Sequence, residues 1–519
     1  MKLVKSLLLG SAAGLIAVGG AQAADLPVKA KAVEYVKICS LYGAGFYYIP
    51  GTDTCIKLGG YVRADALANT NSDYGIGQGA PAGGKNRLSG YYTTRARFDF
   101  NVDTRTATEY GVVRTYADVI FSWDTPSVTG SGGGTTAPTG SASLGLYHAF
   151  IQFAGFTFGR TVSIFDAPWQ SYPAGGPDFL PGGTNWVTGI NQVAYTADFG
   201  QGITASVALQ DQSTGAGGQS NLWNASAFAA AGSVSSAGVV TVTPAATVAA
   251  AALIQGQYGV SDWGGTRVPD IVGAVRVDQA WGLAQFSVAA HNIHSGYYGS
   301  TEVTNHPADK WGWAVQGALS IKNIPTGAGD SINLQAVYTD GASHYNFQSL
   351  FPQTLFMYGG SGIGAYQSLG FAGIADGVYG TIGGVGTGID TVKTWGFRGG
   401  YTHNWTPNWA SGIYGAYAQL KYGDTGKTLI CNNFNAVWGA TATCNPDFNL
   451  AVVGGNVVWT PVKGLAFTTD VSYVWLDQKY SGTIAGAATA NSAVAKPAAT
   501  YELKDQGNLQ VLFRAQRTF

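Results

Sequence analysis

Apolar and polar residues alternate with a period of two along much of this chain. The clearest runs lie at 202–210, 331–339 and 464–475, where most apolar residues occupy every second position and polar residues lie between them. Successive side chains of an extended strand point to opposite faces, so this alternation separates an apolar face from a polar one. The pattern predicts an all-β fold.

The connections between the predicted strands alternate in length. Turns of a few residues, such as 154–155 and 461–464, alternate with long stretches rich in glycine, serine, threonine and proline, such as 124–143 and 478–507. A soluble sandwich has no reason to sort its connections this way, whereas an outer-membrane barrel has short periplasmic turns and long extracellular loops. We therefore predict a transmembrane antiparallel β-barrel of about 16 strands. They lie near residues 56–68, 90–103, 109–123, 144–153, 156–161, 188–198, 203–211, 268–277, 283–292, 311–321, 330–339, 392–403, 409–421, 448–460, 465–477 and 508–519.

The composition supports a barrel in lipid over a soluble protein. Only 11% of the residues are charged, against roughly 25% in ordinary soluble domains. Aromatic residues make up 13% and there are 75 glycines, which favours strands and turns over helices. The 28 basic residues nearly balance the 29 acidic ones, so the charge argues against nucleic acid as a partner.

The N-terminus has the features of an export signal. Lys2 and Lys5 precede an apolar run at 7–18, and Ala21-Gln22-Ala23 gives the small-x-small pattern of a cleavage site. The alternative is a membrane anchor, but the run is too short to span a hydrocarbon core of about 30 Å. We predict a signal peptide at 1–23, an N-terminal segment at 24–55 and the barrel at 56–519.

Four cysteines form two local pairs, Cys39 with Cys55 and Cys431 with Cys444. In an exported chain such pairs favour disulfides. Zinc is the alternative, but there is no C-x-x-C motif and neither pair lies near a histidine in the sequence. We predict two disulfide bonds.

Two patterns that are typical of enzymes are incomplete in this chain. The stretch 423–428 imitates a phosphate-binding loop, but Lys421 stands where the first glycine is required and no helical pattern follows. His291 and His294 could hold a metal, yet no third ligand is evident, so solvated histidines at a strand end are the preferred interpretation. We therefore predict no catalytic residues, no metal and no cofactor.

The last strand ends in an aromatic residue. Phe519 closes the chain, and Val511, Phe513 and Ala515 share its face, although Arg517 interrupts the pattern. Alternate apolar residues ending in phenylalanine resemble the recognition signal of the barrel-assembly machinery. We predict that machinery as a partner through Phe519.

Three stretches resemble the alphaproteobacterial porin family. They are CSLYGAGFYYIPGTDTCIKLGGYVR at 39–63, VPDIVGAVRVDQAWG at 268–282 and VLFRAQRTF at 511–519. The resemblance implies a homotrimeric barrel of 16 strands in the bacterial outer membrane, in contact with lipid and lipopolysaccharide, that passes ions and small hydrophilic solutes. Long insertions at about 212–267 and 340–391 depart from the family pattern.

Charges on the predicted strands mark the lumen. Arg95 and Arg97 share one strand face, and Phe98 lies on the other. A charge facing lipid at the midplane would cost about 2–4 kcal/mol, so the charged face must be the lumen. The same argument places further arginines inside, and these side chains could instead form a structural ion-pair ladder. The predicted wall residues are Arg63, Arg95, Arg97, Arg114 and Arg398.

The connection at about 162–187 looks like the family's loop that folds into the barrel. Asp166 and Asp178 would then face the wall arginines and create a transverse field at a constriction. An ordinary surface loop is the alternative.

Two rival functions remain. A channel selective for a sugar or another nutrient would share these features and needs an aromatic ladder in the lumen. A secreted adhesin would show short repeats, and none is obvious.

Overall fold

The computed structural model describes most of the chain, which divides into two units at Met1–Lys57 and Leu58–Phe519. The predicted signal peptide at 1–23 lies outside the described residues. The described residues are 37–71, 92–125, 141–169, 172–175, 180–184, 187–212, 220–226, 232–234, 240–242, 250, 252–299, 302–347, 353–359, 367–486 and 499–519.

The first unit contains a small hairpin closed by a disulfide. Cys39 and Cys55 are bonded, which confirms the predicted pair. β1 (Tyr47–Tyr48) pairs antiparallel with the first residues of β2 (Thr54–Asn69). Phe46 and the two cysteines form its buried core. The bond crosslinks a segment whose own apolar core is very small.

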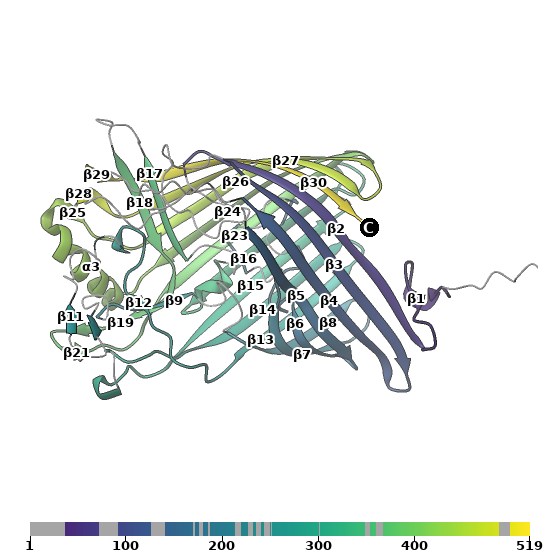
Figure 1. Ribbon diagram of the computed structural model, residues 1–519, viewed down its shortest axis with the longest axis horizontal. Coiled ribbons are helices and arrows are strands. Elements are labelled where there is room, and N and C mark those ends of the chain that lie inside the picture. Colours follow the sequence, from purple (N-terminus) through teal and green to yellow (C-terminus); the bar gives the residue numbers. More distant parts are fainter. Residues whose placement is uncertain are drawn as a thin grey trace, which may run out of the picture. The chain divides into compact units, whose positions relative to one another are not determined.

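The second unit is built on a closed antiparallel barrel (Figure 1). Each long strand pairs with the next one along the chain, and β30 pairs with β2 to close the sheet. Every predicted strand corresponds to one barrel strand, so the prediction of sixteen is confirmed among the described residues. They are β2 (Thr54–Asn69), β3 (Tyr92–Thr108), β4 (Gly111–Asp124), β5 (Ser141–Phe153), β6 (Phe156–Thr161), β7 (Ile190–Asp198), β8 (Ile203–Gln210), β13 (Asp270–Gln279), β14 (Gly282–Ile293), β15 (Lys310–Lys322), β16 (Ser331–Asp340), β23 (Lys393–Thr406), β24 (Trp409–Lys421), β26 (Phe448–Val462), β27 (Leu465–Gln478) and β30 (Gln506–Thr518).

The outer face of the barrel is apolar and has an aromatic band near each rim. Trp395 and Trp405 lie at opposite ends of the outer face of β23 and are both exposed. At roughly 3.3 Å per residue and a tilt of about 40°, these rings stand about 25 Å apart along the barrel axis. This height matches the apolar band of a barrel that spans the outer membrane.

Short and long connections gather at opposite ends of the barrel (Figure 1). Ala154 and Gly155 link β5 to β6 with φ values of 49° and 84°. Two consecutive residues in this left-handed region suit a two-residue hairpin turn. The rim with the short turns is the periplasmic one by the plan of such barrels, so the long connections are extracellular.

The long connections contain folded elements, which we call the cap. Within it, β9 (Asn221–Asn224), β12 (Val260–Ser261), β19 (Ala375–Tyr379) and β22 (Asp390–Thr391) form one sheet. A second sheet contains β17 (Thr354–Gly359), β18 (Ser368–Gly373), β25 (Ala442–Thr443), β28 (Ser481–Gly486) and β29 (Ala499–Leu503). The remaining short elements are β10 (Gly232–Val234), β11 (Val240–Val242), β20 (Thr381–Ile382), β21 (Val385–Gly386), η1 (Ser40–Tyr42) of the first unit, η3 (Glu302–Thr304), η4 (Ser343–Tyr345) and η5 (Gly439–Thr441).

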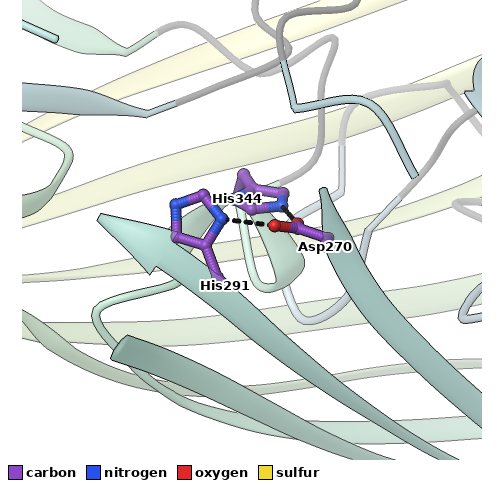
Figure 2. A group of neighbouring side chains, drawn as sticks. All are labelled: Asp270, His291 and His344. Carbon is purple, nitrogen blue, oxygen red and sulfur yellow. Dashed lines mark hydrogen bonds and ion pairs between the residues drawn. The ribbon is translucent and has the colours of Figure 1, made fainter. Parts of the chain in front are cut away.

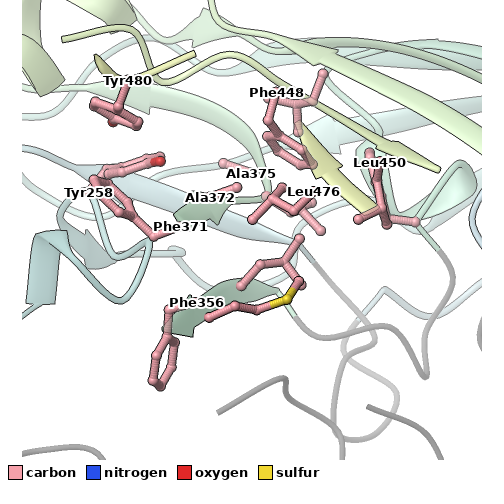
Figure 3. Close-up of a cluster of buried hydrophobic side chains, with 14 of the residues drawn as sticks. Tyr258, Phe356, Phe371, Ala372, Ala375, Phe448, Leu450, Leu476 and Tyr480 are labelled. Atoms are coloured by element: carbon pink, nitrogen blue, oxygen red, sulfur yellow. The ribbon is translucent and has the colours of Figure 1, made fainter. Parts of the chain in front are cut away.

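A large apolar core joins the cap to the barrel (Figure 3). Tyr258 and Phe371 from the two insertions pack in one buried cluster with Phe448, Leu450 and Leu476 of the barrel strands. Burying apolar area of this kind is the main stabilising term in folding. The described parts of the two insertions are therefore packed against the barrel.

The cap also contains α3 (Asp424–Trp438), which the sequence prediction missed. The helix begins within the stretch that imitates a phosphate-binding loop, where no helix was expected. Asp390 Oδ2 accepts a hydrogen bond from Gly426 N at 2.8 Å, so a carboxylate of the chain itself lies at the N-terminus. Cys431 of α3 is bonded to Cys444, as predicted. Among the described residues, no helix is both long and apolar enough to cross a bilayer.

Candidate functional site

The described residues of 162–187, namely 162–169, 172–175, 180–184 and 187, lie inside the barrel, and we call them the inward segment. Its backbone carbonyls accept hydrogen bonds from amide side chains that line the lumen. Gln285 Nε2 of β14 donates to the carbonyls of Phe165 at 3.2 Å and Asp166 at 3.0 Å. Gln316 Nε2 of β15 donates to the Phe165 carbonyl at 2.7 Å. These contacts fix the start of the segment against the wall.

The middle of the inward segment is held further around the same wall. Asn333 Nδ2 of β16 donates to the Pro173 carbonyl at 2.7 Å. Asn456 Nδ2 of β26 donates to the Ala174 carbonyl at 3.0 Å. The segment therefore runs along the lumen from β14 to β26, where each buried carbonyl needs a donor.

Arg398 of β23 anchors the end of the inward segment. Its Nη2 donates to the Thr184 carbonyl at 2.7 Å, and its Nη1 donates to the carbonyls of Leu180 and Gly183, both at 3.2 Å. The residue is only 1% exposed. Arg398 thus points into the lumen as predicted, but the inward segment covers it, so its charge does not line open water.

Two glycines allow this close approach. Gly182 has a φ of 92°, and an added Cβ would lie 2.5 Å from the Phe397 carbonyl carbon. A Cβ on Gly183 would lie 2.1 Å from the Gln335 amide nitrogen. Any side chain here would push the segment off the wall.

The opposite side of the lumen is charged, and we call the lumen faces of β30, β2, β3 and β4 the charged wall. Ion pairs cross from strand to strand on it. Arg95 Nε lies 2.6 Å from Asp124 Oδ1, and Arg114 Nη2 lies 2.9 Å from Asp103 Oδ2. A further pair joins Arg514 to Asp65 at 2.7 Å. Arg95 and Arg114 therefore belong to an ion-pair ladder, the alternative that the sequence left open.

Arg63 and Arg97 of the charged wall donate to neutral oxygens. Arg63 Nε donates to Gln516 Oε1 at 2.8 Å, and Arg97 Nε donates to Ser122 Oγ at 3.0 Å. Tyr172 of the inward segment lies close enough to Arg63 to interact with it electrostatically. The inward segment therefore comes nearest to this wall at Tyr172.

The acidic residues of the inward segment do not both face the charged wall. Asp166 is only 2% exposed, and Arg398 and Tyr345 are among its electrostatic neighbours. It therefore lies on the packed side of the segment, toward Arg398 and not Arg95 or Arg97. Asp178 lies outside the described residues.

Toward the extracellular end, the lumen faces of β24, β26 and β27 are mostly apolar, and we call this part the covered wall. Ala418, Leu450 and Leu476 on these faces are buried under the cap and the inward segment. The outer faces of the same strands carry exposed apolar residues such as Val453 and Trp475. Strands that are apolar on both faces signal burial on both faces, and this signal in 450–453 and 473–476 could have predicted the cap.

The interpretation of His291 as a solvated histidine is wrong. His291 is fully buried, and its Nδ1 lies 2.7 Å from Asp270 Oδ1. His294 instead pairs with Asp309. Two more polar residues near His291, His344 and Asp376, lie far along the chain, so the spacing of residues in the sequence could not reveal them.

Comparison with known proteins gives a consistent result. Residues 25–512 match the family described as the porin subfamily. The chain is 29% identical to Porin Omp2b of Brucella suis over 65% of this chain and 84% of that protein. It is 30% identical to Porin Omp2b of Brucella abortus over 65% of this chain and 85% of that protein. The outer membrane channel DcaP of Acinetobacter baumannii has a similar fold, with a TM-score of 0.54, 17% identity, and coverage of 91% of this chain and 99% of that one.

Proposed function

The chain belongs to the porin subfamily and is an outer-membrane channel for passive diffusion, and from that premise we propose that its solutes pass between the inward segment and the charged wall. Ions and small hydrophilic solutes suit this path because charged and polar side chains line one side of it. Related chains are channels and not enzymes.

The observation that carries the proposal is the one-sided anchoring of the inward segment. Its carbonyls are bonded to donors on β14, β15, β16, β23 and β26. Arg398 under it is 1% exposed, whereas the side chain of Arg114 on the charged wall is 30% exposed. Water and solutes therefore meet the charged wall and not the anchor.

Arg63 and Arg97 should set the ion preference in this path. Each guanidinium donates to a neutral oxygen in the bonds given above, and carboxylates lie near both, Asp65 near Arg63 and Asp118 near Arg97, so the two arginines add positive charge to a mixed field. In a narrow lumen, the positive charge of these two arginines favours anions locally. We propose the pair, together with the ladder around them, as the selectivity element of the constriction.

Planar bilayers test the path directly. Arg63→Gln with Arg97→Gln should shift the reversal potential in a salt gradient toward cation preference. Lys322→Gln is the matched control, because Lys322 is the last residue of β15, at the short-turn rim, and its side chain is half-exposed there. If the double variant behaves like the control, the solute path lies elsewhere.

A second candidate is a channel selective for sugars or aromatic solutes. Tyr116 and Phe150 stack with ring centroids 5.4 Å apart, and the Arg114 guanidinium lies 5.3 Å from the Tyr116 ring. Rings beside arginines could give solutes a stacking surface. Concentration-dependent current block by an oligosaccharide series, lost in Tyr116→Ala, would favour this function; no block at any concentration would exclude it.

We propose that the chain assembles as a homotrimer, as the family resemblance implies. Small residues at 58–60 make β2 and the neighbouring last strand candidates for the contact. Gly60 also has a role within the chain, since an added Cβ would lie 2.1 Å from the Asp99 carbonyl oxygen. We propose the outer faces of β2 and β30 as the contact. Native mass spectrometry in detergent that finds only monomers would contradict it.

Contacts with the membrane and with the assembly machinery are also proposals. The exposed outer face suits lipid and lipopolysaccharide, which barrels of this kind meet in the outer membrane. Phe519 is 58% exposed and stacks on Phe98 at 6.2 Å, so its ring is accessible from outside. Phe519→Ala should lower the amount of inserted barrel, measured as the heat-modifiable band in membranes.

A further inference from the structure

Three side chains that could bind a metal converge at the extracellular end of the lumen (Figure 2). Asp270 is the first residue of β13, and His291 lies on the adjacent strand β14. His344 comes from η4, which follows β16. One donor atom from each lies within 4.8 Å of the others, and Figure 2 shows the Asp270 carboxylate between the two imidazoles.

A second carboxylate completes the group. Asp376 of β19 lies on the other side of His291, with its Oδ2 3.6 Å from His291 Nε2. Both residues are fully buried, and neither of these two atoms makes a hydrogen bond to any residue that the structure describes. The two atoms face each other, so a proton on His291 Nε2 pairs with the Asp376 carboxylate and leaves Nδ1, on the Asp270 side, available to a cation.

The charges of these four residues indicate what kind of ion the group binds. Asp270 and Asp376 are both buried, and two buried carboxylates need two positive charges nearby. Two protons on His291 and His344 would supply them, but the two ring centroids are only 5.1 Å apart and the cations would repel each other. One divalent cation supplies both charges and leaves both imidazoles neutral, which is the form that binds metals.

The surroundings hold the carboxylates in place, as they do in metal sites. Tyr345 Oη donates to Asp270 Oδ2 at 2.7 Å, and Gln212 Nε2 donates to Asp270 Oδ1 at 2.7 Å. Ser343 Oγ donates to Asp376 Oδ1 at 2.9 Å. Each carboxylate is oriented by neighbours while retaining lone pairs for a cation.

We propose that this cluster binds one divalent transition-metal ion of the zinc class. Asp270, His291 and His344 are its ligands, and Asp376, at the opposite edge of the His291 ring, accepts a hydrogen bond from His291 Nε2 and orients that imidazole. Two imidazoles with carboxylates suit Zn²⁺ and its neighbours, whereas Ca²⁺ and Mg²⁺ prefer oxygen ligands. Small shifts are required, because donor atoms around a tetrahedral Zn²⁺ are about 3.4 Å apart.

The ion would fasten the insertion to the barrel beside the inward segment. His344 and Asp376 belong to the connection after β16, and Asp270 and His291 belong to the wall. Tyr345, next to His344, packs on Phe165 of the inward segment with ring centroids 4.5 Å apart. Gly182 N also donates to the Asn346 carbonyl at 3.0 Å. Binding should therefore stabilise the inward segment as well as the cap.

The test uses the full barrel without an affinity tag, purified in detergent and freed of metal with EDTA. Zn²⁺ alone is titrated by calorimetry, Co²⁺ is titrated by its visible absorption, and melting temperature is recorded with and without Zn²⁺. His344→Gln and Asp376→Asn are the variants. His403→Gln is the matched control, because His403 also lies close to a carboxylate, 2.7 Å from Asp330 Oδ2, at the other end of the barrel. Heat-modifiable migration shows that each variant is folded.

One Zn²⁺ per chain, a higher melting temperature with Zn²⁺, and affinity lowered by about tenfold to 100-fold in Asp376→Asn, and by more in His344→Gln, would support the proposal. The control should bind like the unmodified chain. No saturable binding by the folded chain would overturn it and leave an ionic network of charged histidines. Binding that is equally tight in both variants would also overturn it, because the ion would then sit elsewhere.

Discussion

The charged wall and the covered wall are parts of the same barrel, yet they are built in opposite ways. On the charged wall, arginines and aspartates alternate with lipid-facing apolar residues, and ion pairs such as Arg95–Asp124 cross between strands. On the covered wall, lumen residues such as Leu476 are apolar and buried. The barrel itself is continuous through both, so the difference comes from what lies against each wall. The lumen face is apolar where the cap packs on it, and it is polar both where water reaches it and where side chains such as Gln316 donate to buried carbonyls.

The two walls should also contribute differently to the stability of the protein and to the electric field in the pore. Ion pairs that remain partly solvated contribute little to stability, about 0–1 kcal/mol each. A fully buried leucine or phenylalanine contributes about 1.5–3 kcal/mol through its burial alone. The covered wall should therefore hold the cap and the inward segment in place, and the charged wall should set the field in the pore. The following changes separate these roles.

The largest effect is expected at Arg398, on β23 next to the covered wall. Arg398→Met removes the donors of three buried carbonyls, so the free energy of unfolding should fall by about 3–5 kcal/mol. Urea unfolding in detergent, followed by tryptophan fluorescence, measures this loss. Arg114→Met is the control, because Arg114 donates to Asp103 and Gln152 on the opposite side of the lumen and Asp103 keeps Arg105 as a partner. Equal losses in the two variants would contradict the anchoring role.

The next effect tests the covered wall alone. Leu476→Ala should lower the free energy of unfolding by about 3 kcal/mol, because it opens a cavity under the cap. Val471→Ala, on the outer face of the same strand, should cost much less because Val471 is 44% exposed. Hydrogen exchange should show faster opening of α3 in the first variant only. If exchange in α3 stays unchanged, the cap does not depend on this wall.

A smaller change in stability, with a clear change in conduction, is expected on the charged wall. Asp103→Asn removes the carboxylate shared by Arg105 and Arg114. The reversal potential should shift toward anions, while the free energy of unfolding should fall by only about 1 kcal/mol. The shift should shrink near 1 M salt, where the Debye length is about 3 Å. Asp278→Asn, near the short-turn rim, should leave the potential unchanged.

The smallest effect is expected at Asp166. Because it lies on the packed side of the inward segment, Asp166→Asn should leave the reversal potential unchanged. This outcome would distinguish the structure from the simpler expectation that Asp166 opposes Arg95 and Arg97 across the pore. A clear shift toward anions would place the carboxylate in the solute path and contradict our assignment.

Local patterns were enough to predict the barrel. Alternation with a period of two identified each barrel strand, and the cost of a charge in lipid assigned Arg95, Arg97 and Arg114 to the lumen. The two disulfides followed from the spacing of the cysteines. Each of these properties depends on residues that are close in sequence or on a single face of one strand.

What the sequence did not reveal depends on contacts between distant segments. Arg398 occupies a lumen-facing position on its strand, as the other wall arginines do, and only the position of 180–184 shows that it is covered. Asp376 and His344 meet His291 because the insertion folds back over the wall. The helix α3 was missed because its stretch begins with glycines and polar residues, and packing against the cap core stabilises it beyond its intrinsic propensity.

The pairing of β2 with β30 has a consequence for biogenesis. Tyr61 lies opposite Thr518, so the seam of the barrel joins residues from nearly opposite ends of the chain. Such long-range pairing makes folding slow, and until the last strand arrives β2 presents an unpaired edge that can recruit other chains. The final residues therefore act as a checkpoint for completeness: a chain that lacks them cannot seal, and it remains a substrate for chaperones and proteases in the periplasm.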